Sequence, residues 1–201
     1  MKINTIGQLR KLYGHPGGRA AQKILPALEQ HSIHFIEKSP FMLMATFSKD
    51  GALDVSPRGG SAGFVKVLDK KQIIIPDFKG NNRIDSLTNI LETGRIGTLF
   101  LIPGVDETLR VNGSAFISTD EELLAQYSAE KHPPKTCLAV QVEEVFLHCA
   151  KALMRSKLWN PSIQIDRSQF PSMGEMMKDQ LNLQEMTESQ EEMVRRYAQE
   201  I

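Results

Sequence analysis

The sequence contains little that suggests a secreted, nucleic-acid-binding or membrane-embedded protein. Its two cysteines, Cys137 and Cys149, form no CxxC pair, so neither a disulfide framework nor a zinc motif is expected. The 24 lysines and arginines are balanced by 24 aspartates and glutamates, so the basic excess of a nucleic-acid binder is missing. No stretch approaches the ~18 apolar residues of a membrane span, and the N-terminus lacks a signal-peptide core. We therefore expect a soluble, cytoplasmic protein whose ligand is small.

Catalytic and metal-binding signatures are also scarce. His31 and His34 are three residues apart, but no third ligand lies nearby in the sequence, so we expect surface histidines and no metal site. No Ser-His-Asp, Cys-His or paired-carboxylate arrangement stands out, and the catalytic residues are therefore unknown. His132 and His148 are candidate acid–base groups only in the sense that histidine titrates near neutral pH.

The apolar pattern predicts a mainly β protein. Apolar runs and alternation indicate short strands over residues 41–47, 52–56, 64–68, 72–75, 96–102, 108–117 and 136–146. Tight turns join most neighbours, which predicts an antiparallel barrel or sandwich with peripheral helices. The run 96–102 is apolar without interruption, so we expect it to be buried on both faces.

Helices are expected at both ends of the chain and in two crossovers. Residues 1–17 contain a short helical segment, and residues 18–32 have helical periodicity with Pro26 as the weak point. A helix over 83–93 would bury Ile84, Leu87 and Leu91 on one face. A Thr119–Glu122 capping box would begin a helix running to about residue 129.

The stretch from residue 54 to 91 holds two polar, Gly-rich turns, residues 56–60 and 79–83, each with an arginine. Arg83 lies at a helix start, where the macrodipole disfavours a cation by a few tenths to ~1 kcal/mol unless an anion shares the site. Helix N-termini bind phosphate through free N–H groups. We therefore predict a phosphate held by Arg58, Arg83 and the amides of Asn81 and Asn82. The alternative is that both arginines are solvated and Asn82 is an ordinary N-cap.

The C-terminal part begins with a basic segment. Lys151, Arg155 and Trp159 are spaced by four, so on one helix they would share a face and form a lid over a planar anion. The alternative is a basic helix with Trp159 as a core anchor. Residues 161–201 are dotted with methionines and carry a Thr187–Gln190 capping box. They predict a helical extension that packs on the barrel or a partner subunit, or else a methionine-lined channel.

Four segments together resemble the pyridoxamine 5′-phosphate oxidase-like flavoproteins, the FMN-binding split-barrel group, within which the chain is similar to a subgroup of FMN-dependent enzymes. They are DVSPRGG (54–60), IPDFKGNNRIDSLTNIL (75–91), the LFLIPG and ETLRVNGSA hairpin (99–104, 107–115) and HCAKALMRSKLW (148–159). The resemblance covers residues 35–160 and implies a six-stranded antiparallel Greek-key split barrel. It also implies a homodimer whose interface holds two FMN sites lined by both subunits. Residues 1–34 and 161–201 would be helical flanks.

The resemblance also implies which residues bind the cofactor. Arg58, with Ser56 beside it, and the turn containing Asn81, Asn82 and Arg83 fall at the two phosphate-binding positions. Ile75 and Pro76 fall on the strand whose backbone runs along the isoalloxazine ring. The residues expected to close the site from the opposite subunit are Lys151, Arg155, Ser156 and Trp159.

The oxidase's own phosphate motif and its arginine-rich C-terminal signature are absent, so pyridoxamine phosphate is not the expected substrate. We predict an FMN-dependent oxidoreductase that acts on an unidentified small molecule. NADH or NADPH is the candidate electron donor. Arg110 or Lys151 is the candidate cation near the flavin's pyrimidine end. The alternatives are a flavin carrier without turnover and a split barrel that binds haem or a deazaflavin. For haem, the candidate axial ligands are His132, His148 and Cys149.

Overall fold

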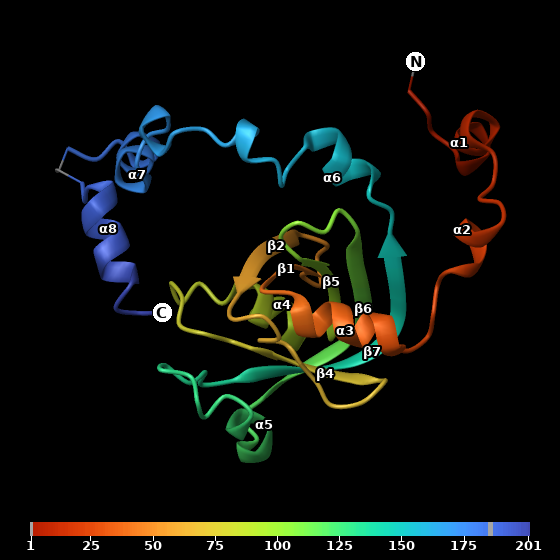
Figure 1. The fold of residues 1–201 in the computed structure, drawn as a ribbon, viewed down its shortest axis with the longest axis horizontal. Helices are drawn as coiled ribbons and strands as arrows, with labels where there is room; N and C mark the ends of the chain where they lie inside the picture. Colours follow the sequence, from red (N-terminus) through yellow and green to blue (C-terminus); the bar gives the residue numbers. More distant parts are fainter. Residues whose placement is uncertain (1, 185–186) are drawn as a thin grey trace.

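The computed structural model describes residues 2–184 and 187–201. One antiparallel sheet with strand order β2-β1-β5-β6-β7-β4-β3 curls around the core, and helices lie at its periphery (Figure 1). The strands are β1 (Phe41–Phe47), β2 (Leu53–Gly59), β3 (Lys66–Val67), β4 (Gln72–Pro76), β5 (Arg95–Leu101), β6 (Thr108–Ser118) and β7 (Cys137–His148). The helices are α1 (Ile6–Tyr13), α2 (Arg19–Gln22), α3 (Gln30–Lys38), α4 (Asp85–Thr93), α5 (Glu121–Ala125), α6 (Lys151–Ser156), η1 (Pro161–Ile163), η2 (Arg167–Gln169), α7 (Met173–Leu181) and α8 (Gln190–Tyr197). The predicted mainly β fold with antiparallel hairpins and peripheral helices is confirmed.

The core fills one side of the curled sheet. Met42 and Met44 of β1 and Phe100 of β5 are fully buried. The prediction that β5 is buried on both faces is wrong, because burial alternates along the strand and Leu99 and Leu101 are only half-buried. An uninterrupted apolar run shows that neither face carries a charge, but it does not show what covers the second face.

The N-terminal region departs from the sequence expectation. A single helix over residues 18–32 is wrong: α2 ends at Gln22, Leu25 forms an antiparallel bridge with Val145 of β7, and α3 starts at Gln30. Pro26 explains the break, since proline lacks the N–H and its ring clashes with a preceding helical turn. The side chain of Glu29 then caps α3 by accepting from two backbone N–H groups.

Helix α4 packs against β1, β2, β5 and β6, but only part of the expected face is buried. Leu87 is half-buried against the core, as expected, whereas Leu91 is 75% exposed and Ile84 precedes the helix. The buried residues are Ser86, Asn89 and Ile90. The prediction was wrong because two polar side chains are buried through hydrogen bonds, and a hydrophobic pattern does not detect such burial.

Two helix caps also differ from the expected ones. Asp120, not Thr119, caps α5 by accepting from the N–H groups of Glu122 and Leu123. Helix α8 begins with a capping box formed by Ser189 and Glu192, so the predicted Thr187–Gln190 box is wrong. In both cases a better acceptor lies one or two residues further along the chain.

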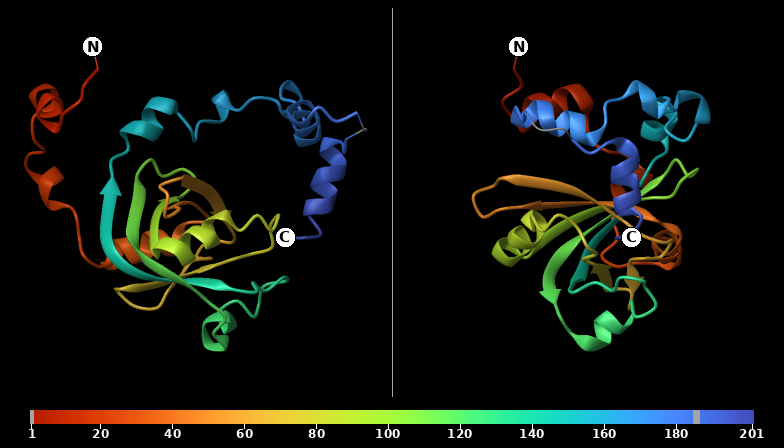
Figure 2. Two further views of the ribbon diagram at one scale, coloured as in Figure 1. Left: turned by 180° about the vertical axis from the view of Figure 1, so that it is seen from behind. Right: turned by 90° about the vertical axis from the view of Figure 1, so that its left-hand side faces the viewer.

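The two ends of the chain form arms outside the curled sheet (Figure 2). We call residues 2–22 the N-terminal arm and the described residues from 150 to the C-terminal end the C-terminal arm. Helices α1, α7 and α8 bury none of their residues. Within the described residues, no helix has the length and hydrophobicity needed to cross a membrane.

Candidate functional site

Three segments of the fold converge where β2 passes the start of α4. The Ser56 and Ser86 hydroxyl oxygens lie 3.0 Å apart, which joins β2 to the first turn of α4. The Arg58 guanidinium lies 4.0 Å from the Asp77 carboxylate, which joins β2 to the end of β4. We call Ser56, Arg58 and residues 79–86 the candidate phosphate site.

The N-terminus of α4 has no side-chain cap. Among the described α-helices of eight or more residues, α1, α3, α7 and α8 are capped by Thr5, Glu29, Ser172 and Ser189, and α4 is the exception. The first N–H groups of any helix lack intrahelical acceptors. At α4 they are therefore available to an external anion, as at known phosphate sites.

The backbone before α4 adopts an uncommon conformation. Asn82 (φ 59°) and Ile84 (φ 53°) both lie in the left-handed region, which a β-branched residue such as isoleucine seldom enters. The N-cap position belongs to Ile84, so the alternative in which Asn82 is an ordinary N-cap is wrong. The Asn81 side chain accepts from the N–H of Arg83 at 3.1 Å and braces the turn.

Each cation at this site has a carboxylate partner. Arg83 Nε donates to Asp85 at 2.8 Å, and this hydrogen bond raises the pKa of Arg83. The anion required beside Arg83 is therefore supplied by the chain itself, two residues further along. Lys79 pairs with Glu200 at 3.0 Å, near the end of the C-terminal arm.

Arg58 has the loosest partner of the three cations. Its distance to Asp77 is 4.0 Å, and the two side chains are 26% and 30% exposed. Burial raises the pKa of Asp77, and the positive charge of Arg58 opposes that rise. Arg58 is thus the cation best placed to exchange its partner for a ligand anion.

A buried polar network, which the sequence analysis missed, positions the start of α4. Ser86 Oγ donates to Asp54 at 2.5 Å, and Thr46 Oγ1 lies 3.4 Å from the same carboxylate oxygen. Asn89 Nδ2 donates to Thr46 at 3.0 Å. Because the hydroxyl hydrogen of Ser86 is directed at Asp54, Ser56 is the donor in the contact between the two serines. The three-residue spacing of Ser86 and Asn89 was the signal available in the sequence.

Ile75 and Pro76 can offer a ligand only their backbone. The Ile75 side chain is fully buried in the core, and Pro76 is also buried. Strand β3 pairs with β4 only at Ile73 and Ile74, so the edge of β4 beyond Ile74 has no neighbouring strand. The predicted contact between this backbone and the isoalloxazine ring remains a prediction.

The predicted basic face on one helix is wrong. Helix α6 ends at Ser156, and Lys157 takes a left-handed conformation (φ 54°), so Trp159 lies beyond the helix. Trp159 Nε1 donates to the Val105 carbonyl at 2.9 Å, which makes the tryptophan a half-buried anchor for the C-terminal arm.

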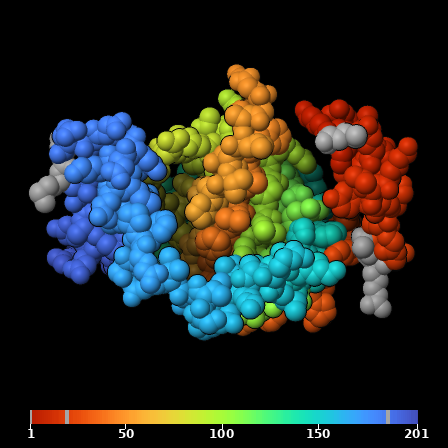
Figure 3. All heavy atoms as spheres, turned by 90° about the horizontal axis from the view of Figure 1, so that it is seen from above, coloured from red at the N-terminus to blue at the C-terminus, as the bar shows by residue number. Residues whose placement is uncertain are grey.

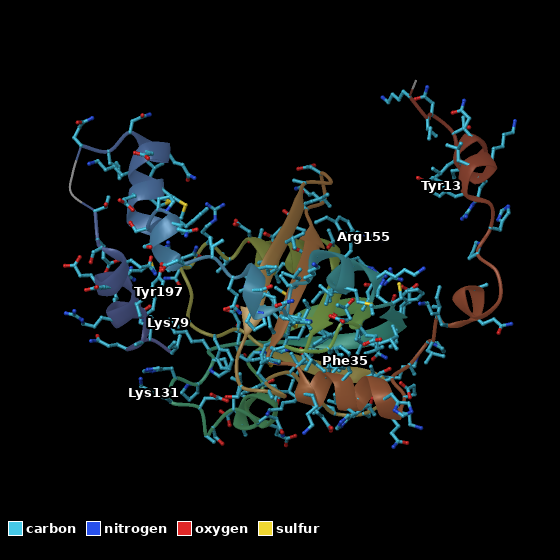
Figure 4. The ribbon with its side chains drawn as sticks, turned by 45° about the horizontal axis from the view of Figure 1, so that its top comes forward. Tyr13, Phe35, Lys79, Lys131, Arg155 and Tyr197 are labelled. Carbon is cyan, nitrogen blue, oxygen red and sulfur yellow. The ribbon has the colours of Figure 1, made fainter. Side chains whose placement is uncertain are left out.

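The remaining α6 residues lie away from the candidate phosphate site. The side chains of Lys151, Arg155 and Ser156 are exposed. In Figure 4 the labelled Arg155 is separated from the labelled Lys79. Within one chain, these three side chains therefore do not lie beside the turns at residues 56–60 and 79–83. Their role in cofactor binding remains a prediction.

The candidate haem ligands have no special arrangement. Burial and the nearby positive charges of Arg110 and Lys23 lower the pKa of His148. His132 shares a hydrogen bond with the carbonyl of Gln199, and Cys149 is an exposed free thiol. Among the described residues, no group of three metal-ligating side chains comes together.

Comparison with known proteins relates the chain to one family. The profile for pyridoxamine 5′-phosphate oxidase matches residues 28–149 of the chain. No curated protein matches. A crystal structure of HupZ from Group A Streptococcus is similar, with 20% identity and a TM-score of 0.51 over 60% of this chain and 93% of that chain. A single-substitution variant of HupZ has 20% identity and a TM-score of 0.50, over 59% of this chain and 98% of that chain.

A third similar structure is that of a Clostridium acetobutylicum protein related to general stress protein 26 of B. subtilis (pyridoxinephosphate oxidase family). Its identity is 14% and its TM-score 0.42, over 59% of this chain and 85% of that chain. The HupZ structures support the fold alone, whereas the profile covers more than half of the sequence. The chain therefore belongs to the pyridoxamine 5′-phosphate oxidase family.

Proposed function

We propose that the protein binds FMN, with the phosphate at the candidate phosphate site, and acts as an FMN-dependent oxidoreductase on a small molecule. Proteins of this family commonly bind flavin. The observation that carries the proposal is the uncapped N-terminus of α4, reached through two left-handed residues and joined through β2 to Arg58, whose pair with Asp77 is loose. These features suit a compact dianion better than a neutral ligand.

The residues present fit a phosphate group. The first N–H groups of α4 would donate to its oxygens, favoured by the helix dipole. Arg58 would add a charge-assisted hydrogen bond in exchange for its loose pair with Asp77. The Ser56 hydroxyl, which donates to Ser86 in the structure, would turn its hydrogen toward the phosphate.

A bound flavin supplies hydride or electron transfer, whereas the protein supplies position and electrostatics. The backbone at Ile75 and Pro76 is the candidate edge for the ring, because it lies beyond the end of β3 and next to Asp77 and Arg58. Arg110 pairs with Glu144 across β6 and β7, and Lys151, which lies away from the candidate phosphate site of its own chain, would act as the cation from a second chain.

The test is an absorbance spectrum of the purified protein with added FMN, followed by anaerobic addition of NADH or NADPH. An oxidoreductase that uses a nicotinamide donor would show flavin bands that bleach. Flavin bands that persist with these and other screened donors would support a carrier instead. A sharp Soret band would indicate haem, and FMN fluorescence that is unchanged by the protein would contradict the proposal.

A further inference from the structure

Charged side chains gather on the face of the sheet opposite the core, which we call the outer face. Residues of β6 alternate between buried and half-buried, and Arg110 is among the half-buried ones. In the register of β6 and β7 it lies directly opposite Phe146, which is also half-buried. Arg58 of the candidate phosphate site lies on the other face, because it is in register with the fully buried Met42. The charged group around Arg110 is therefore separate from that site.

Three nitrogen-containing side chains surround the ring of Phe146. Lys23 Nζ lies 4.3 Å from the centroid of this ring, and Arg110 Cζ lies 4.8 Å from it. The imidazole of His148 lies 4.8 Å away, measured between ring centroids. Lys23 belongs to the segment after α2, which lies beside the end of β7 (Figure 3). The fold thus brings together Lys23, Arg110 and His148 from three parts of the chain, and we call them the outer-face cluster.

The outer-face cluster has more positive than negative charge around it. Within the described residues, the guanidinium of Arg110 donates only to Glu144, at 2.6 Å, and its Nε is buried without an acceptor. Lys23 Nζ donates to the Leu147 carbonyl at 2.8 Å and has no carboxylate partner in the same part of the chain. Two cations and one carboxylate leave one positive charge when His148 is neutral.

Gathering these groups costs free energy, which a bound anion would offset. Burial and the positive charges of Arg110 and Lys23 lower the pKa of His148, so its ring is neutral at pH 7 and offers one N–H donor. The next charged pair along these strands, Arg95 with Glu143, is satisfied internally at 2.9 Å. An anion beside Lys23 and Arg110 would reduce their mutual repulsion and raise the pKa of His148.

We propose that the outer-face cluster binds the carboxylate group of a small organic acid. A carboxylate has the single negative charge that balances the cluster, and it accepts charge-assisted hydrogen bonds from a guanidinium and an ammonium group together. A phosphate dianion would leave an excess negative charge beside Glu144, and a neutral ligand would leave the two cations uncompensated. The proposal does not depend on flavin binding, because none of these residues belongs to the candidate phosphate site.

The first test follows the ring signals of His148 by NMR while acetate, the simplest carboxylate probe, is added at constant ionic strength with chloride as the reference anion. The variant His148→Gln assigns these signals among the five histidines of the chain. We expect a saturable shift with acetate, a higher pKa of His148 in the saturated protein, and weaker binding of inorganic phosphate at a pH where it is a dianion. A response to acetate no greater than that to chloride would overturn the proposal, and so would tighter binding of phosphate than of acetate.

A second test removes each cation in turn. Lys23→Met keeps an unbranched side chain without its charge, and Lys49→Met, at an exposed position of the β1–β2 turn, is the matched control. We expect roughly tenfold weaker acetate binding in Lys23→Met and Arg110→Gln and unchanged binding in Lys49→Met. In ligand-free Lys23→Met, the pKa of His148 should also be higher than in wild type.

Arg110→Gln leaves Glu144 without its ion-pair partner, so circular dichroism must verify its fold. Lys23→Met breaks no ion pair among the described residues and tests the proposal independently. Acetate binding as tight in Lys23→Met as in wild type would overturn the proposal. Equal weakening in Lys23→Met and Lys49→Met would do the same, because it would reflect the net charge of the chain instead of a site.

Discussion

At the scale of single residues, Asp77 controls how available Arg58 is to a ligand. The two side chains form a loose pair at 4.0 Å, and a bound phosphate would compete with Asp77 for the guanidinium. We therefore expect Asp77→Asn to bind FMN several-fold more tightly than wild type, as measured by fluorescence titration. Asp50→Asn, in the exposed β1–β2 turn, is the control. Weaker binding by Asp77→Asn would show that the carboxylate contributes to the site.

The pKa of Asp77 also predicts a pH dependence of stability. Burial raises this pKa above its ordinary value of 3.8, so the folded chain retains the proton to a higher pH than the unfolded chain. The free energy of unfolding contributed by Asp77 is then greatest at low pH and falls as pH rises through the raised pKa. Asp77→Asn should remove this fall just above pH 3.8, as urea unfolding across that range would show. An identical pH profile in variant and wild type would contradict the prediction.

Ile84 carries backbone strain at the candidate phosphate site. Its left-handed conformation costs roughly 1–2 kcal/mol in an L-residue, and its side chain is 58% exposed, so little packing compensates. Asparagine tolerates this conformation. We expect Ile84→Asn to raise the free energy of unfolding by up to about 1 kcal/mol, and Ile84→Val, which keeps the β-branch, to leave it unchanged. Equal effects in chemical denaturation would count against backbone strain.

The sequence alone predicted where the charges lie but not how they pair. The macrodipole argument requires an anion beside Arg83, and Asp85, two residues further along, supplies it through a hydrogen bond that the spacing alone does not indicate. The Lys79–Glu200 pair joins residues far apart in the chain, and no local pattern indicates it.

At the scale of elements, α4 is held on β1 and β2 by buried polar contacts. Ser86 donates to Asp54 and is only 3% exposed, so Ser86→Ala leaves a carboxylate without its closest donor. Such a loss costs about 1–3 kcal/mol. Thr88→Ala, at an exposed position of the same helix, should change the free energy of unfolding by less than about 0.5 kcal/mol. Urea denaturation of both variants would test this, and similar small effects would contradict a structural role for the network.

Strands with alternating apolar and polar residues could be predicted from the sequence. The buried face of a helix that packs through polar groups, and the ends of helices, could not. The hairpins β1–β2 and β3–β4 follow from apolar runs separated by turn residues. The buried face of α4 did not follow, because Ser86 and Asn89 are buried by hydrogen bonds with Asp54 and Thr46. The helix predicted over residues 18–32 is interrupted near Pro26, and a separate helix, α3, begins at Gln30.

At the scale of the whole molecule, a curled antiparallel sheet carries the candidate phosphate site, and two arms extend beyond the sheet. The segment predicted to form the split barrel, residues 35–160, overlaps closely with residues 28–149 that match the family. The helical flanks were predicted from composition, but their large exposed surface could be recognised only from coordinates.

The central claim is that the start of α4, with Arg58, binds a phosphate group. The most direct test compares the dissociation constants of FMN and riboflavin, which differ by that phosphate, in wild type, Arg58→Ala and Arg95→Ala. Arg95 pairs with Glu143 on β7 and is the control. A charge-assisted hydrogen bond contributes about 1.5–3 kcal/mol, or roughly a tenfold to hundredfold change in affinity. We predict that wild type and Arg95→Ala prefer FMN by at least tenfold and that Arg58→Ala loses most of this preference. Equal affinity for FMN and riboflavin in wild type, or equal weakening of both ligands in Arg58→Ala, would contradict the account.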